Sequence, residues 1–190
     1  MLKMRISGLY SADLQNGPGV GVTLGTAGCY KRCKGCFNSR FWGLYSGIEY
    51  GDKHKKQILD LISKDYIDHF SIIGGEPLIA ENLFELDDLT DAIKLTRPDI
   101  KIWIWSGYTW DEILHAKMIP KDGSVSSITK RYNLAALLDK TDYLVDGPFI
   151  QKLADSTLPW RGSANQRIID VQSTIKKIKH SREYAPVIYS

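Results

Sequence analysis

Residues 29–36 read CYKRCKGC and hold all three cysteines of the 190-residue chain, Cys29, Cys33 and Cys36. An odd number of cysteines in so short a stretch is unlike a disulfide framework. Clustered free thiols are typical of a metal or redox site in a reducing compartment, so we expect a cytoplasmic protein. Basic residues lie between the cysteines, which argues against a buried core segment.

Three chemistries use thiolates at this spacing. A structural zinc ion takes four ligands, and every histidine lies at least 18 residues beyond Cys36, so a fourth ligand would come from a distance. A redox Cys-x-x-Cys needs only Cys33 and Cys36 and leaves Cys29 unexplained. A cubane iron–sulfur cluster is normally held by four thiolates, so three would leave one iron open for a substrate. The residues alone leave these interpretations open.

Apolar runs with strand character alternate with amphipathic helical patterns along the chain. The expected strands span residues 21–24, 69–73, 101–105 and 143–145, and the expected helices span 53–63, 83–95, 110–115 and 134–138. Such alternation predicts a parallel α/β sheet of about five or six strands, too few for a closed barrel of eight. We expect a single domain over residues 1–190, with a polar loop near 120–133 and a short, irregular C-terminal tail.

The composition excludes several functional classes. Hydrophobic residues make up 43% and charged residues 25% of the chain, as in ordinary globular proteins. No apolar run approaches the roughly 18 residues of a membrane span, and the N-terminus does not resemble a signal peptide. A net charge of +3 is too small to indicate nucleic-acid binding. We therefore expect neither a membrane nor a nucleic acid as a partner.

The spacing Cys-x3-Cys-x2-Cys after a first strand resembles the hallmark of radical S-adenosylmethionine (SAM) enzymes. Further short motifs accompany it in a fixed order, each weak by itself: residues 16–19 (NGPG), 37–38 (FN), 74–78 (GGEPL), 103–108 (WIWSGY), 145–147 (VDG), 160–163 (WRGS) and 165–166 (NQ). Together, over residues 10–168, they resemble the activating proteins of anaerobic (class III) ribonucleotide reductases.

This resemblance implies a partial, incomplete parallel β/α barrel of the radical SAM type, with one [4Fe-4S] cluster on Cys29, Cys33 and Cys36. It also implies SAM as the second cofactor, whose amino and carboxylate groups chelate the open iron. Reductive cleavage of SAM then gives a 5′-deoxyadenosyl radical, so the cofactors rather than a catalytic side chain carry the chemistry. The implied protein substrate is the large subunit of the anaerobic ribonucleotide reductase, which receives a glycyl radical.

The resemblance assigns the SAM amino group to the strand end at Gly74, Gly75 and Glu76. Glycines let a backbone approach a ligand closely. The alternatives are an ordinary glycine turn and a Glu76 that points away and supports the loop. Ser106, at the end of another strand, is expected near the SAM carboxylate or ribose, or else in a local turn.

Gly35 and Phe37 flank Cys36 and are expected beside the adenine of SAM. Alternatively, Phe37 packs the cysteine segment onto the sheet. We interpret Trp103 and Trp105 as sheet packing, because strand alternation places them on one face. Two further residues, Trp160 and Arg161, either dock the partner or close the core.

A basic rim around the cysteines could steer an acidic, low-potential electron donor such as a flavodoxin; it comprises Lys31, Arg32, Lys34 and Arg40. A homodimer or a heterotetramer with the reductase is a possible assembly. Two other functions stay open. One is an activase for a different glycyl-radical enzyme, such as pyruvate formate-lyase. The other is a non-enzymatic, zinc-binding interaction module.

Overall fold

Strand β2 (Gly21–Thr26) is buried along its whole length and runs toward the three cysteines. The computed structural model, which describes residues 2–189, places it in an eight-stranded sheet with the order β3-β1-β2-β4-β5-β6-β7-β8. Parallel pairing joins β2 to β4 (His69–Gly74), β4 to β5 (Lys101–Trp105) and β5 to β6 (Tyr143–Asp146). The four strands expected from the sequence are confirmed, and they form the parallel centre of the sheet.

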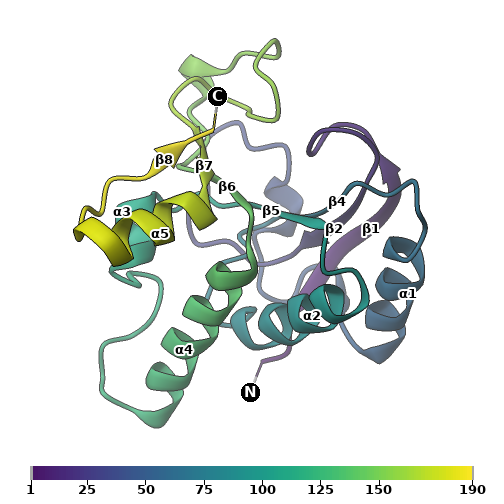
Figure 1. Cartoon of the computed structure of the whole chain (residues 1–190), viewed down its shortest axis with the longest axis horizontal. Coiled ribbons are helices and arrows are strands. Elements are labelled where there is room, and N and C mark those ends of the chain that lie inside the picture. The colour runs from purple at the N-terminus through teal and green to yellow at the C-terminus, as the bar shows by residue number, and fades with distance from the viewer. Residues whose placement is uncertain (1, 190) are drawn as a thin grey trace.

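Helices connect the central strands and cover one face of the sheet (Figure 1). They are α1 (Asp52–Ile62), α2 (Leu83–Thr96), α3 (Trp110–Leu114) and α4 (Val125–Lys140). The central strands follow one another in space as they do in the chain. Right-handed crossovers therefore all run in the same direction, and α1, α2 and α4 line up along the same side of the sheet.

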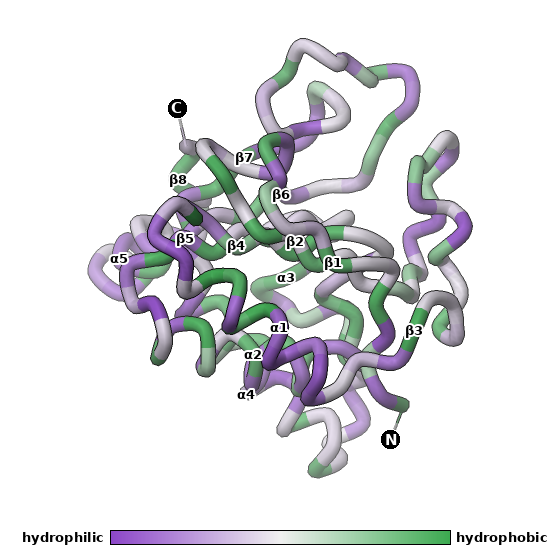
Figure 2. Tube along the Cα trace, turned by 90° about the vertical axis from the view of Figure 1, so that its right-hand side faces the viewer, coloured by the Kyte–Doolittle hydropathy of each residue, from purple (hydrophilic) through white to green (hydrophobic). Residues whose placement is uncertain are grey.

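Side-chain alternation along β5 separates the two faces of the sheet. Ile102 and Ile104 belong to the main hydrophobic core beneath the helices. Trp103 and Trp105 lie on the opposite face, in a smaller cluster with Val145 and Ile168. Figure 2 shows hydrophobic residues along the central strands and on the inner sides of the helices. The predicted packing role of Trp103 is confirmed, since its side chain is fully buried.

Four additional strands make the sheet larger than the predicted five or six strands, and mixed instead of parallel. They are β1 (Arg5–Asp13), β3 (Ile48–Glu49), β7 (Arg167–Asp170) and β8 (Val187–Ile188), all paired antiparallel. The two-residue strands are too short to carry a hydrophobic period. Strand β1 is mostly exposed or half-buried, so it lacks the apolar alternation that marks a strand.

The predicted polar loop near 120–133 is wrong from Val125 onward, where α4 begins. Ser124 caps this helix, because its side chain accepts a hydrogen bond from the amide of Ser127. The first half of α4 exposes its apolar side chains, and the buried leucines come only at 134–138, so the early turns show no apolar stripe. Helix α5 (Val171–Ser181) precedes the tail expected to be irregular after His180, and within that tail Val187 and Ile188 form strand β8.

Short 3₁₀ helices at Ser39–Phe41 and Gln151–Leu153 complete the secondary structure described for this chain. Within residues 2–189, no helix is both long enough and apolar enough to cross a membrane.

Candidate functional site

A cavity of about 470 Å³ lies at the carboxyl ends of the central strands. All three cysteines line it, together with residues that follow β4, β5 and β6. Ligands collect at this edge in parallel α/β folds, because the loops there diverge and leave a crevice. The cavity therefore joins the candidate residues that the sequence placed in separate motifs.

The cysteine loop, residues 29–36, is anchored at its start. The amides of Gly28 and Cys29 donate to the carbonyls of Phe41 and Trp42 (2.8 and 3.0 Å), and the amide of Cys36 donates to Cys33 O (3.2 Å). Cys29 is buried, and Cys33 and Cys36 are half-buried. Burial raises the pKa of the Cys29 and Cys33 thiols. Both are therefore more protonated than exposed thiols until a metal or another positive charge binds.

The glycine-rich end of β4 packs directly on this loop. The amide of Gly75 donates to Thr26 O, and that of Glu76 donates to Gly28 O, both at 2.8 Å. A Cβ atom on Gly75 would lie 2.5 Å from Gly28 O, a distance that packing forbids. Gly74 has a φ of +115°, which favours glycine. These glycines thus allow two backbones to meet beside Cys29.

Glu76 is buried, with 1% of its surface exposed, and it connects the ends of β4 and β5. Its carboxylate accepts hydrogen bonds from Ser106 Oγ (2.8 Å), Gly107 N (2.6 Å) and Leu78 N (3.0 Å). Burial raises its pKa to about 7, although these donors favour the charged form. The contacts support the interpretation in which Glu76 supports the loop, and they occupy the hydroxyl of Ser106.

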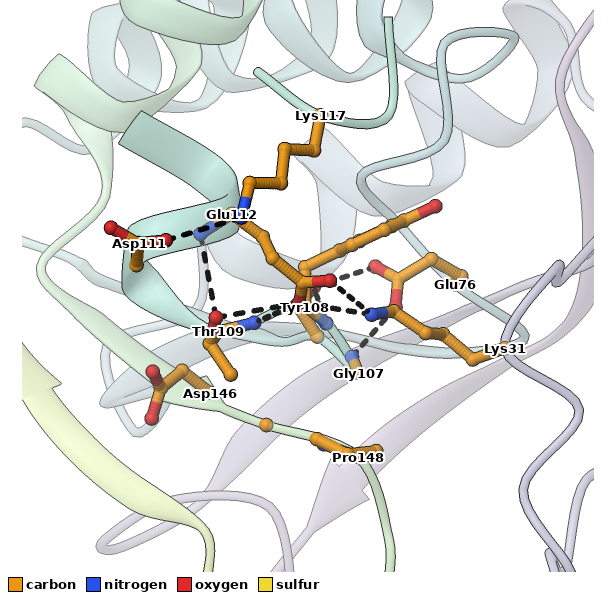
Figure 3. A network of polar contacts seen from close by, with 12 residues as sticks. Lys31, Glu76, Gly107, Tyr108, Thr109, Asp111, Glu112, Lys117, Asp146 and Pro148 are labelled. Carbon is orange, nitrogen blue, oxygen red and sulfur yellow. Dashed lines mark hydrogen bonds and ion pairs between the residues drawn. The ribbon is translucent and has the colours of Figure 1, made fainter. Parts of the chain in front are cut away.

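Lys31 extends the same network to helix α3 (Figure 3). Its Nζ lies 2.9 Å from both carboxylate oxygens of Glu112 and 4.2 Å from the centre of the Tyr108 ring. The Lys31 ammonium and the donors of Thr109 lower the pKa of Glu112 despite partial burial. Lys31 is therefore paired inside the protein, so it is not a free member of the predicted basic rim.

The segment after β6, residues 147–166, closes another side of the cavity. It projects above the sheet in Figure 1. The Phe149 ring lies 6.3 Å from that of Phe37, and a Cβ on Gly35 would come 2.8 Å from Gln151. Phe37 is 90% exposed, so the alternative in which it packs the loop onto the sheet is wrong. Its ring instead edges the cavity.

Trp160 and Arg161 both line the cavity. The indole N–H of Trp105 donates to Trp160 O (2.8 Å). This hydrogen bond holds the Trp160 backbone, whose φ is +53°. Arg161 donates from Nη1 to Gln166 O (3.2 Å). Its Nε is buried, and among residues 2–189 we find for it neither a hydrogen-bond acceptor nor a carboxylate partner for the guanidinium.

Comparison with known proteins gives the cavity a context. A family model described as a 4Fe-4S single cluster domain matches residues 15–169. The anaerobic ribonucleoside-triphosphate reductase-activating protein of Vibrio cholerae is 38% identical over 161 residues, or 84% of this chain and 93% of the relative. The proteins of that name from Escherichia coli K12 and Enterobacteria phage T4 are 34% and 31% identical, covering 83% and 87% of this chain and 92% and 93% of theirs.

The chain belongs to the family of anaerobic ribonucleoside-triphosphate reductase-activating proteins. The resemblance found in its sequence motifs is thereby confirmed. The family model also supports an iron–sulfur cluster as the group that the cysteines hold. Thiolates are soft ligands that suit such clusters.

The three thiols are soft ligands of the kind that iron–sulfur clusters take. Each of them lines the cavity from its own position in the loop. A cubane takes one thiolate on each of its irons, so three thiols match three of its four irons. Cys29, Cys33 and Cys36 would therefore hold three irons of the cluster in this member of the family.

Every predicted site residue lines the cavity except Gly35, which lies beside Gln151. Their contacts with SAM stay predictions. Two cavity residues were not predicted: Asn38, whose side chain donates to Gly74 O (3.2 Å), and Gln166, which accepts from the amides of Gly162 and Ser163. Both residues belong to short motifs shared with the activating-protein family, and those motifs were the available signal.

Proposed function

We propose that this protein activates an anaerobic ribonucleotide reductase through radical SAM chemistry. In this reaction SAM accepts one electron, its S–C5′ bond breaks, and the resulting 5′-deoxyadenosyl radical takes a Cα hydrogen from one glycine of the reductase. The products are methionine, 5′-deoxyadenosine and a glycyl radical. The observation that supports this most is the Cys-x3-Cys-x2-Cys loop, which shares one cavity with the β4 strand end in a chain of this family.

The bound cluster would supply the electron that cleaves SAM. The task of the chain is then to hold the cluster, orient SAM and keep water out. The β4 end places Gly74 and Gly75 at the cavity wall, where a backbone can approach the amino-acid part of SAM. Phe37 offers an exposed aromatic face at the rim for the adenine.

The central sheet suits this proposal. We propose that its four parallel strands, with their helices on one face (Figure 1), are the core of the partial barrel that the resemblance implies. The opposite face bears the cavity residues Ile73 and Trp105, so a ligand would lie on the side away from the helices. A partner's glycine loop could reach the ligand there without displacing a helix.

We also propose an electron donor, a cellular compartment and an assembly for this reaction. Arg32, Lys34 and Arg40 are exposed and could receive an acidic donor such as a flavodoxin. Free thiols require a reducing compartment, in agreement with a cytoplasmic protein. A homodimer or a heterotetramer with the reductase large subunit remains part of this proposal.

We assign the carboxylate of SAM to Arg161. Three charged side chains other than the cysteines line the cavity: Lys31, Glu76 and Arg161. Lys31 is paired with Glu112, and Glu76 is satisfied by hydrogen-bond donors. Of the two cations among these three, Arg161 is the one without a carboxylate partner in residues 2–189, so it is the group suited to neutralise an anionic ligand.

Replacing Arg161 by glutamine should weaken SAM binding to the cluster-bearing protein by at least about tenfold, as expected when one partner of a desolvated charge pair is lost. Binding of 5′-methylthioadenosine, which lacks the amino-acid part, should change little. Anaerobic calorimetry with both ligands measures the difference. Lys34→Gln removes an exposed charge of the cysteine loop and serves as the control. Equal weakening of both ligands would contradict the assignment.

Electron paramagnetic resonance tests the function as a whole. The sample contains this protein with its cluster, SAM, a reductant and a class III reductase. We expect a glycine-centred doublet on the reductase that disappears when its radical glycine is changed to alanine. No doublet despite SAM consumption would indicate another substrate, and pyruvate formate-lyase would be tested next. A protein that holds one zinc ion and takes up no iron would support the interaction module instead.

A further inference from the structure

Lys31 carries a positive charge into the cluster site. It stands between Cys29 and Cys33 in the chain and lines the same cavity. Its side chain is only 21% exposed, unlike the neighbouring Arg32 and Lys34, which face solvent. A charge held at this depth is screened less by water and salt than a surface charge.

Glu112 holds that charge in one place. The Lys31 Nζ contacts both of its carboxylate oxygens at 2.9 Å, and the Glu112 side chain is 27% exposed. Glu112 is itself fixed by a capping box at the start of α3. Its carboxylate accepts from the amide of Thr109 (2.9 Å), and its amide donates to Thr109 Oγ1 (3.3 Å). The pair therefore joins the cysteine loop to a helix 81 residues further along the chain.

Besides Glu112, a carboxylate and an aromatic ring face Lys31, whereas the cations of its own loop, Arg32 and Lys34, are exposed and Arg161 lines the same cavity. Glu76 and Tyr108 face Lys31 from the ends of β4 and β5 (Figure 3), and the cysteines belong to its own loop. Reduction of a cluster bound by three thiolates adds a further negative charge at this place. A nearby cation favours that reduction, and a nearby carboxylate opposes it.

We infer that Lys31 and Glu112 are positioning residues that set the reduction potential of the cluster as a charge-compensated pair. Lys31 supplies the cation that favours the reduced cluster. Glu112 orients this cation and offsets most of its effect. The inference rests on the proposed function, because it requires a cluster on Cys29, Cys33 and Cys36.

An anaerobic redox titration followed by electron paramagnetic resonance tests the inference on the reconstituted protein. Lys31→Met leaves Glu112 unpaired, so the ratio of reduced to oxidised cluster at a fixed potential should fall at least threefold. Glu112→Gln leaves Lys31 unpaired, so the ratio should rise by a similar factor. Threefold corresponds to about 28 mV, since tenfold is 59 mV for one electron. The double variant should return close to the wild-type potential.

Three controls separate charge from loop packing. Lys31→Arg keeps the charge and should keep the potential. Lys34→Met removes an exposed charge of the same loop and should have a much smaller effect than Lys31→Met. The iron content of each variant is measured first. If Lys31→Met proves unstable, Glu112→Gln still tests the inference, because glutamine retains a side-chain oxygen for the capping box.

The decisive results are potential shifts of opposite sign in Lys31→Met and Glu112→Gln, and their cancellation in the double variant. Shifts of the same sign in both single variants, or no shift, would overturn the inference even when wild-type protein binds its cluster and SAM normally. A Lys34→Met shift as large as that of Lys31→Met would overturn it too. If the wild-type protein takes up no cluster, the proposed function itself is wrong, and the inference fails with it.

Discussion

Changing any one of Cys29, Cys33 and Cys36 to alanine will leave the protein with little bound iron and no SAM cleavage. The chain contains no other cysteine that could replace the lost ligand. A cubane normally takes four thiolates, so a site that already has three cannot lose another and keep its cluster. Wild-type protein should bind about four irons per chain, and each variant well below half of that. Iron and sulfide analysis after anaerobic reconstitution measures the effect.

Lys34→Ala provides the matched control, because Lys34 lies in the same loop, is exposed and does not line the cavity. It should reconstitute like the wild-type protein. A cysteine variant that retains a full, SAM-cleaving cluster would contradict the assignment of that cysteine. Retention of the cluster by the Cys29→Ala variant would be the most informative result. The only thiols left would then be Cys33 and Cys36, the Cys-x-x-Cys pair that a redox site needs.

The elements predicted correctly are those whose local pattern is strong. The run KIWIW at 101–105 is a strand in the structure with the same limits, because alternating isoleucine and tryptophan fill two different faces. The buried strand at 69–73 extends by one residue, to Gly74. In contrast, β3 and β8 are held by pairing with neighbours and have two residues each, so no local pattern could reveal them.

The residues of the candidate site also fall into two groups, those with a local sequence motif and those without one. Its cysteines and glycines are close in sequence and form recognisable motifs. The partners of its charged residues are distant. Lys31 meets Glu112, 81 residues away, and Glu76 meets Ser106, 30 residues away. Such pairs depend on the order of the strands, and a single sequence carries no direct signal for them.

For a larger residue at Gly75, the sequence motif and the structure predict different effects. From its motif alone, a larger residue there would exclude SAM and leave the cluster in place. In the structure, a Cβ on Gly75 would lie 2.5 Å from Gly28 O and 3.1 Å from the carbonyl carbon of Ala27. Both atoms belong to the backbone that leads into Cys29, and neither can rotate away. The clash therefore concerns the cysteine loop before it concerns a ligand.

Gly75→Ser should consequently lower both stability and cluster content. Forcing the extra Cβ and Oγ atoms into a packed site costs about 1–3 kcal/mol, which for a domain of this size lowers the melting temperature by several degrees. The shift of Gly28 should also break the hydrogen bond from Glu76 N and misplace Cys29. We expect less than half of the wild-type iron, measured together with thermal unfolding followed by circular dichroism.

Gly51→Ser is the matched control, because a Cβ on Gly51 meets nothing within 4 Å, and serine is well suited to the N-cap position of α1 that Gly51 occupies. It should keep the wild-type iron content and unfold at an equal or higher temperature. If Gly75→Ser instead keeps its full cluster and loses only SAM affinity, then the backbone at Gly28 yields to the new side chain. The glycine would in that case be required by the ligand, as its motif suggests, and not by the contact between β4 and the cysteine loop.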